Sequence, residues 1–151
     1  MKTIKNLQVI GHSDRIDFTE IGLENVACKI DTGADTSSVD CHKIRIREKD
    51  GKEVLVFRLL HPKNPNYLEK DMTVENFTEK VIRNSFGNEE NRYFVKLKVM
   101  LMGEEFESEF SLANRSGMTF PVLLGKKLLK KRFIVDVSKK NVSFNLKENL
   151  Q

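Results

Sequence analysis

The sequence predicts an all-β domain, because short runs of alternating apolar and polar residues recur along it between turn-forming residues. Such alternation places every second side chain on one face of a strand. Many short strands at roughly even spacing are typical of a closed barrel or a sandwich. The 151 residues fit a single domain, residues 1–151, that can bury a core without disulfides or metal.

Two alternating runs give the clearest strand predictions. In the run 25–30, the apolar residues on one face are Val26, Cys28 and Ile30. In the longer run 91–102, they are Tyr93, Val95, Leu97, Val99 and Leu101. Each run therefore presents one apolar face to a core.

The other elements are shorter. Asp50-Gly51 separates the runs 43–47 and 53–60, and Asp-Gly between alternating runs predicts a tight hairpin. We expect one short helix over residues 126–131. Further strands are expected over 6–11, 79–84, 105–112, 122–124, 134–137 and 141–144, and breaks or loops over 12–14, 61–71, 85–88 and 114–121.

Composition and charge narrow the classes of function. The formal net charge is +4, and the densest basic run, 126–132, lies beside apolar Leu128 and Leu129. We interpret this run as the solvated face of a helix, since nucleic-acid binders concentrate basic residues with interleaved aromatics. An acidic partner is compatible with the charge. No apolar run is long enough to cross a bilayer, so a membrane is not an expected partner. Nucleic acid is not expected either, because the basic run lacks interleaved aromatics.

The cysteines and the N-terminal residues indicate a compartment. Met1–Lys5 lacks the apolar segment of a signal peptide. The chain has two cysteines, Cys28 and Cys41. We therefore expect a cytoplasmic protein in which both are reduced, buried thiols.

Asp31-Thr32-Gly33, directly after the run 25–30, carries the most chemical information. Gly33 allows a tight turn, and we expect it to adopt a backbone conformation awkward for other residues. It also leaves no side chain above the carboxylate, so a substrate backbone can approach Asp31. Thr32 can hydrogen-bond to neighbouring backbone and lock the turn. An ordinary Asx turn at the end of a strand can have the same sequence, so the tripeptide alone does not distinguish a catalytic turn from a purely structural one.

A second motif strengthens the interpretation of the Asp31 turn as a functional site. The segment 121–125, Pro-Val-Leu-Leu-Gly, is an apolar strand that ends in glycine and leads into a helical run. Together the two motifs resemble the retroviral aspartic proteases. Over residues 6–145 the chain is similar, more closely, to a bacterial and archaeal retropepsin-like family often labelled ATP-dependent zinc proteases. The matching segments are 29–34, 83–87, 92–93, 114–116 with Met118, Pro121, 123–125 and 135–136.

The resemblance implies a fold and a reaction. The fold is a retropepsin-like closed barrel with one short helix after Leu-Leu-Gly, whose strand holds the Asp-Thr-Gly turn. The reaction is peptide hydrolysis by two aspartates that share one proton, because like charges so close cannot both ionise. The ionised one takes a proton from water, and the neutral one hydrogen-bonds the scissile carbonyl.

The chain contains a single Asp-Thr-Gly turn, since Asp136 is followed by Val137-Ser138. By resemblance, Asp31 is therefore the catalytic residue and pairs with Asp31 of a second copy in a homodimer. The resemblance assigns Thr32, Gly33, Leu124 and Gly125 to support of the turn. It assigns substrate binding to Ala34, Asp35, Ser85, Phe86, Gly87, Arg115 and Lys126.

Two positions depart from the family pattern, which usually has arginine where this chain has Asp35 and Lys126. The two residues can pair with each other, although lysine lacks the bidentate fork of arginine. This change puts the substrate preference in question. The hairpin 79–95, with Phe86 and Gly87 at its tip, is expected to be the flap that covers the cleft.

Two other functions stay open: a peptide-binding module without catalysis, and the zinc hydrolase of the family label. Among His12, His42 and His61 there is no H-E-x-x-H pattern, and neighbouring Cys41 and His42 would point apart on a strand. No glycine-rich phosphate loop is present either, so we predict no metal or cofactor. An acidic peptide would suit four basic residues that could equally face solvent: Arg92, Lys96, Lys98 and Arg115.

Overall fold

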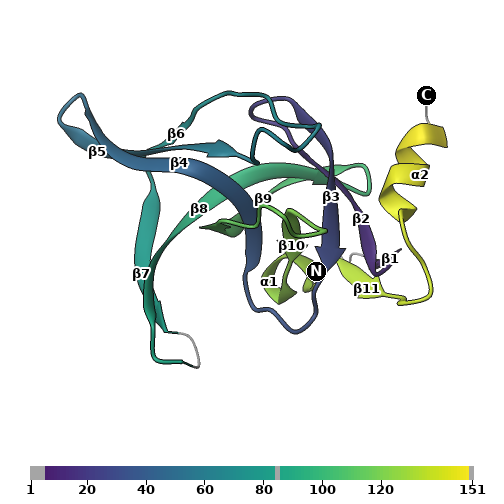
Figure 1. Ribbon diagram of the computed structural model, residues 1–151. Helices are drawn as coiled ribbons and strands as arrows, with labels where there is room; N and C mark the ends of the chain where they lie inside the picture. Colours follow the sequence, from purple (N-terminus) through teal and green to yellow (C-terminus); the bar gives the residue numbers. More distant parts are fainter. Residues whose placement is uncertain (1–5, 84–85, 150–151) are drawn as a thin grey trace, which may run out of the picture.

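The computed structural model describes residues 6–83 and 86–149, and most of them lie in strands (Figure 1). The strands are β1 (Gln8–Ile10), β2 (Ser13–Phe18), β3 (Leu23–Ile30), β4 (Ser37–Lys49), β5 (Lys52–Leu59), β6 (Met72–Val74), β7 (Phe77–Arg83), β8 (Glu89–Leu101), β9 (Glu104–Ala113), β10 (Val122–Leu124) and β11 (Phe133–Val135). The helices are α1 (Lys126–Leu129) and α2 (Val142–Asn149).

Six strands close into a barrel in the order β10-β3-β2-β8-β9-β4, and pairing of β10 with β4 completes the ring. The short strand β10 runs parallel to β3 and antiparallel to β4. Apolar side chains fill the interior, among them Ile16, Val26, Cys28, Val39, Leu97, Val99, Phe110 and Leu124. This closed all-β barrel confirms the predicted retropepsin-like fold.

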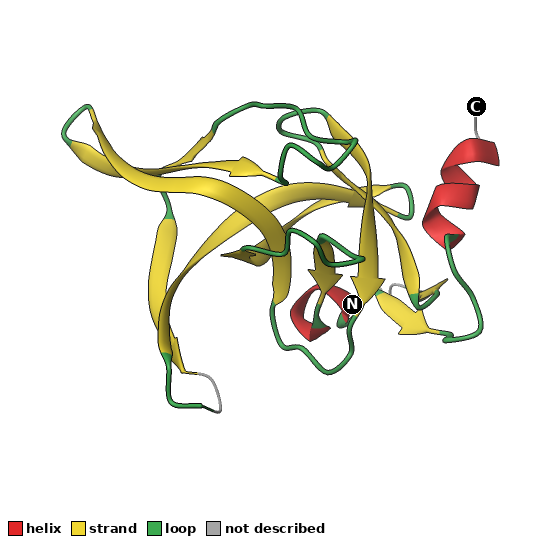
Figure 2. Cartoon of the chain, in the orientation of Figure 1, coloured by secondary structure: helices red, strands yellow, loops and turns green. Residues whose placement is uncertain are grey.

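Two long strands begin or end in the barrel and continue beyond it. After Asp40, β4 leaves the barrel and pairs only with β5, while the first residues of β8, 89–93, pair only with β7. In Figure 2 these two hairpins extend from the same side of the barrel and spread apart. The Asp50-Gly51 turn between β4 and β5 has φ angles of 53° and 77°, so the predicted tight hairpin is confirmed.

Two sequence predictions at the ends of the chain are wrong. Residues 141–144 were expected to form a strand, but they begin the helix α2, so the chain has two helices within its described residues. The carboxylate of Asp14 accepts hydrogen bonds from the amides of Ser143 and Phe144 at 2.8 and 3.0 Å, which fixes the helix start. The expected break at 12–14 contains the start of strand β2.

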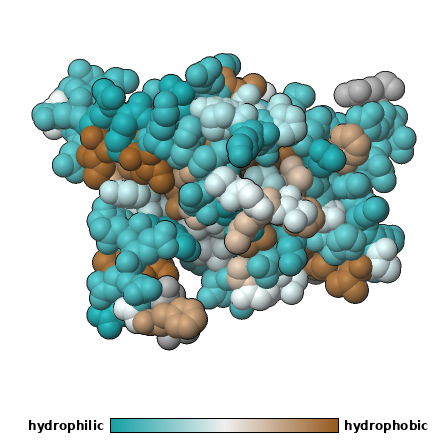
Figure 3. All heavy atoms as spheres, in the orientation of Figure 1, coloured by the Kyte–Doolittle hydropathy of each residue, from teal (hydrophilic) through white to brown (hydrophobic). Residues whose placement is uncertain are grey.

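The surface is largely polar. Figure 3 shows that hydrophilic side chains cover most of one face, with a few separate apolar patches. Exposed apolar residues on β1 and β11 include Val9 and Ile134, which are neighbours in the two-stranded sheet. Across 6–83 and 86–149, no helix is long and apolar enough to span a membrane.

Candidate active site

The Asp31 turn lies between the end of β3 and the start of β4. The backbone N–H of Asp31 donates to the carbonyl of Leu124 at 2.8 Å, and the N–H of Ala34 donates to the carbonyl of Asp31 at 3.2 Å. The N–H of Gly33 donates to Oδ1 of Asp31 at 3.1 Å. This bond orients the carboxylate of Asp31. Because Asp31 is only half-buried, the other carboxylate oxygen, Oδ2, is available to a ligand.

Strand β10 and Gly125, which follows it, hold the Asp31 turn in place. Leu124 is fully buried, and the N–H of Lys126 donates to the carbonyl of Ala34 at 2.7 Å. A Cβ atom on Gly125 would lie 2.8 Å from the carbonyl oxygen of Ala34 and 2.9 Å from the carbonyl carbon of Thr36. Only glycine allows this approach, which brings the Asp-Thr-Gly and Leu-Leu-Gly segments together as the sequence predicted.

Gly33 itself is less constrained than expected. Its φ lies outside the left-handed region, and an added Cβ would lie 3.4 Å from Oδ1 of Asp31. The expectation of an awkward backbone conformation at Gly33 is therefore wrong. Of the two glycines beside the turn, Gly125 leaves the less room for a side chain.

The hydroxyl that ties the loop to β10 belongs to Ser37, which sequence reasoning missed. Its Oγ accepts the N–H of Gly125 at 3.0 Å, and the residue is 1% exposed. Thr32, the hydroxyl expected in this role, is exposed and has no hydrogen-bond partner within the part of the chain that the structure describes. The signal was present in the run Thr36-Ser37-Ser38, where three hydroxyl residues follow one another at the start of β4.

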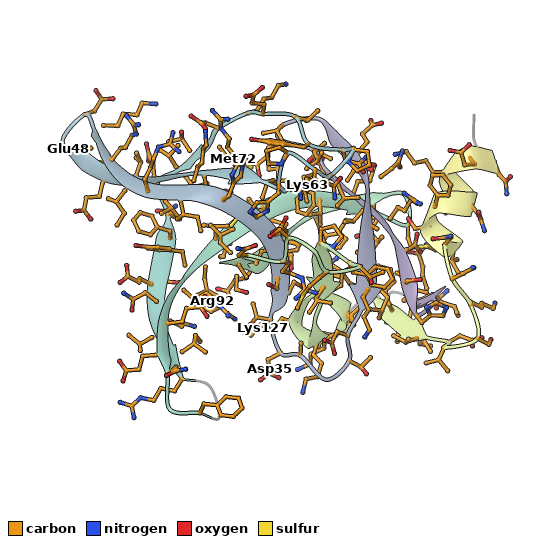
Figure 4. The ribbon with its side chains drawn as sticks, in the orientation of Figure 1. Asp35, Glu48, Lys63, Met72, Arg92 and Lys127 are labelled. Atoms are coloured by element: carbon orange, nitrogen blue, oxygen red, sulfur yellow. The ribbon has the colours of Figure 1, made fainter. Side chains whose placement is uncertain are left out.

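The expected pair between Asp35 and Lys126 is present, with 3.1 Å between Oδ1 and Nζ. The side chains are 82% and 56% exposed, so the pair contributes at most about 1 kcal/mol to stability. Lys127 pairs with Glu109 at 3.3 Å. In Figure 4 Asp35 and Lys127 lie at the lower edge of the barrel, beside α1.

A hollow of about 550 Å³ lies between the turn, α1 and β11. Its lining includes Thr32 and Asp35, the lysines Lys126, Lys127 and Lys130, and apolar Leu129 and Phe133. Lys126 and Lys127 pair with Asp35 and Glu109, and Lys130 adds a further positive charge that suits an anionic group.

The expected flap is the hairpin of β7 and β8. Phe86, near its tip, is 88% exposed, and Gly87 has a φ of 80° that suits glycine. Ser85 lies outside the described residues. Figure 1 shows the lower ends of β7 and β8 and the loop between β3 and β4 at the same lower end of the molecule.

Arg115 does not join the Asp31 turn. It lies in the loop before β10, where its N–H donates to Oδ1 of Asp40 at 2.6 Å and its Nε to the carbonyl of Phe120 at 3.1 Å. From the pairing of Val122 with Cys28, the start of β10 is three residues along β3 from Asp31, or about 10 Å.

The other basic candidates have acidic neighbours. Lys96 and Lys98 lie opposite Glu109 and Glu107 on β9. Arg92 pairs with Glu90 at 3.2 Å. These neighbours favour the interpretation of Lys96 and Lys98 as solvent-facing strand charges, whereas Arg92 is half-buried.

Both thiols are free and buried. Burial, and then the negative charge of Asp40, raise the pKa of Cys41 to about 12. Burial followed by Asp14 raises the pKa of Cys28 far above its usual range. Among residues 6–83 and 86–149, no group of three or more His, Cys, Asp or Glu side chains is arranged to hold a metal ion.

Comparison with known proteins assigns the family. A sequence model described as retropepsin-like aspartic endopeptidase RimB matches residues 9–145. The chain belongs to this RimB-like family. A crystal structure of a Legionella pneumophila protein of unknown function has a similar fold, with a TM-score of 0.67 at 21% identity, covering 91% of this chain and 99% of that one.

Curated relatives of this RimB-like chain carry another name. Probable alpha-L-glutamate ligases from Desulfotalea psychrophila and Shewanella pealeana are 29% and 28% identical to it over 133 residues. The match covers 85% and 88% of this chain but 28% and 29% of those proteins. The chain therefore spans less than a third of the length of these relatives.

Proposed function

We propose that this chain is an aspartic peptidase whose active site forms when two copies bring their Asp31 turns together. The observation that carries the proposal is the Asp31 carboxylate, oriented by the N–H of Gly33 and held against β10. Membership of a family named for an aspartic endopeptidase supports it. The sequence offers one Asp-Thr-Gly turn per chain, so the second carboxylate comes from a twofold partner.

The reaction follows from two carboxylates that share one proton. The ionised Asp31 takes a proton from water, and the water oxygen bonds to the peptide carbonyl carbon. The protonated Asp31 of the other copy donates a hydrogen bond to the carbonyl oxygen. When the C–N bond breaks, the leaving nitrogen receives a proton from the pair, which leaves a carboxylic acid and an amine.

We propose an acidic peptide as the substrate class, with glutamate residues as the favoured side chains. The names of the ligase relatives, which contain a similar segment within a longer chain, support a link to glutamate-bearing peptides. Lys130, which lines the hollow beside the turn together with the paired Lys126 and Lys127, supports it by charge. Such a hydrolase acts in the cytoplasm, where Cys28 and Cys41 stay reduced.

A peptide-binding module on the same fold is the second candidate. The exposed position of Thr32 and the open hollow beside Asp35 suit a bound peptide whether or not it is cleaved. Catalysis and binding differ in their need for the carboxylate of Asp31, so this residue separates the two.

The test compares Asp31→Asn with the control Asp50→Asn, an exposed aspartate in the turn between β4 and β5. Each protein is incubated with a peptide carrying a tail of glutamates, and the products are measured by mass spectrometry. We expect cleavage by the wild type and Asp50→Asn, none by Asp31→Asn, and retained peptide binding by all three. Cleavage by Asp31→Asn would exclude the aspartic mechanism, and binding without cleavage by the wild type would favour the module.

A further inference from the structure

A second cavity, of about 680 Å³, lies at the end of β10 opposite to the Asp31 turn. It is bounded by the loop that follows β5 and the loop that precedes β10. Figure 4 places Lys63, from the first of these loops, on the other side of α1 and β10 from Asp35. No role in the Asp31 site accounts for this cavity.

The cavity is built around the buried carboxylate of Asp40, which is 3% exposed. Oδ1 accepts the N–H of Arg115 at 2.6 Å, and Oδ2 lies 2.7 Å from Nδ1 of His61. This contact orients the imidazole of His61 on the cavity wall. Asp40 thus fixes both the imidazole and the backbone of Arg115 on the cavity wall.

The guanidinium of Arg115 is anchored but not neutralised. Its Nε donates to the carbonyl of Phe120 at 3.1 Å, and within the described residues no carboxylate pairs with it. Its terminal nitrogens form the planar fork that binds carboxylates in two parallel hydrogen bonds. Lys63 adds a second positive charge, and Asp40, the acidic residue of the lining, is already occupied by two donors.

The walls are preorganised. All three prolines of the chain line this cavity: Pro62, Pro65 and Pro121. Proline fixes its own φ, so a wall built from prolines loses little conformational entropy when a ligand binds. Met118, which is 59% exposed, adds an apolar surface for the methylene groups of a side chain.

We propose that this cavity is a second binding site, which takes a carboxylate group of an acidic peptide on the guanidinium of Arg115 and the ammonium of Lys63. The site is separate from the Asp31 turn and does not require Asp31 to be catalytic. If the proposed peptidase function holds, the site retains one part of an acidic chain at the start of β10, which lies about 10 Å along the strand from the turn that receives another part.

The test uses isotopically labelled Asp31→Asn protein, so that no peptide is cleaved, titrated with tetra-L-glutamate and followed by NMR. We expect saturable shifts at His61, Arg115 and Gly117. Arg115→Gln keeps the backbone N–H that binds Asp40, so it should fold and weaken binding about tenfold or more. Lys63→Gln, an exposed position, should weaken it less, and Lys127→Gln beside the Asp31 turn should leave the shifts at these three residues unchanged.

Two further probes define the ligand. Saturable binding of free L-glutamate at the same residues would support a site for a single carboxylate, and binding of the tetrapeptide alone would support a peptide site. Equal binding of tetra-L-glutamine would overturn the proposal, because it would show that charge is not recognised. Shifts confined to residues 32–36 and 126–127, or insensitive to both Arg115→Gln and Lys63→Gln, would overturn it as well.

Discussion

The N–H of Asp31 donates to the carbonyl of Leu124 at 2.8 Å, so the candidate catalytic residue continues the parallel pairing of β3 with β10 by one residue. The carboxylate therefore takes its position from a strand near the other end of the chain. The next residue along, Gly125, is where the two segments come closest.

We predict that Gly125→Ala lowers the free energy of unfolding by about 2–3 kcal/mol, because the new methyl group would overlap backbone atoms of Ala34 and Thr36. Gly33→Ala is the matched comparison, since its methyl group would meet Oδ1 of Asp31 at 3.4 Å. It should cost less than about 1 kcal/mol and still impair cleavage, because the methyl group lies beside the carboxylate. Urea unfolding of both variants measures the difference, and equal losses would contradict the close approach at Gly125.

The sequence predicted the parts of the fold that follow local rules. The alternation in 25–30 and 91–102 and the Asp50-Gly51 turn are properties of neighbouring residues, and these elements formed as expected. Strand β2 was missed because Asp14 and Asp17, at 2% and 9% exposure, interrupt the apolar pattern. Both carboxylates accept hydrogen bonds from α2, near the other end of the chain, and no local sequence pattern reveals this contact.

The candidate site also has parts that the sequence could predict and parts that it could not. The proximity of the Asp31 turn to Leu124 and Gly125 could be predicted, because two motifs of one family specify it. The position of Arg115 could not be predicted, because it depends on the buried carboxylate of Asp40. In the sequence, Asp40 looks like any other polar residue of a strand. The second carboxylate of the proposed pair belongs to another copy of the chain.

The second prediction concerns the attachment of α2. The carboxylate of Asp14 is its N-terminal cap from a distance, with bonds to the amides of Ser143 and Phe144. Asp14→Ala leaves both amides without their acceptor and should cost about 2 kcal/mol. Amide hydrogen exchange should then accelerate at residues 143–149 more than in the barrel. Asp14→Asn keeps one acceptor oxygen and should lose less; equal effects of the two variants would contradict the capping role.

The third prediction is a loss of stability on mild acidification. Burial lowers the pKa of His42, and the nearby charges of His61, Lys43 and Arg58 lower it further. Nε2 of His42 lies 2.9 Å from the Tyr67 hydroxyl. Since the folded state disfavours the protonated ring, the contribution of His42 is fully present above its unfolded pKa of about 6.5. It is lost as the pH falls through the lower folded value.

The measurement is the urea unfolding free energy at several pH values from 7.5 to 5. His42→Gln can still accept the Tyr67 hydrogen bond and should show a smaller decrease than the wild type. His12→Gln is the control for a histidine outside this cluster and should keep the wild-type slope. Hydrogen bonds to Arg58 lower the pKa of Asp71, so that carboxylate loses its contribution only below about pH 3.9, outside this window. An unchanged slope in His42→Gln would contradict the assignment.

The fourth prediction tests the flap. Residues 89–93 of β8 pair only with β7, and β7 is exposed along most of its length, so the barrel contributes little to holding the hairpin tip. Phe86 is 88% exposed. A large apolar side chain at the tip of such a hairpin suits contact with a substrate or with the partner copy, because lids come from the less stable parts of a fold.

Phe86→Ala should change the free energy of unfolding by less than about 0.5 kcal/mol, since the side chain buries little surface within one chain. Against a glutamate-tailed peptide, it should lower kcat/KM about tenfold, because closure over the substrate loses its apolar contact. Val137→Ala, 78% exposed and beyond β11, is the control and should change neither quantity. If Phe86→Ala cleaves the peptide as fast as the wild type, the hairpin 79–95 is not the lid of the Asp31 site.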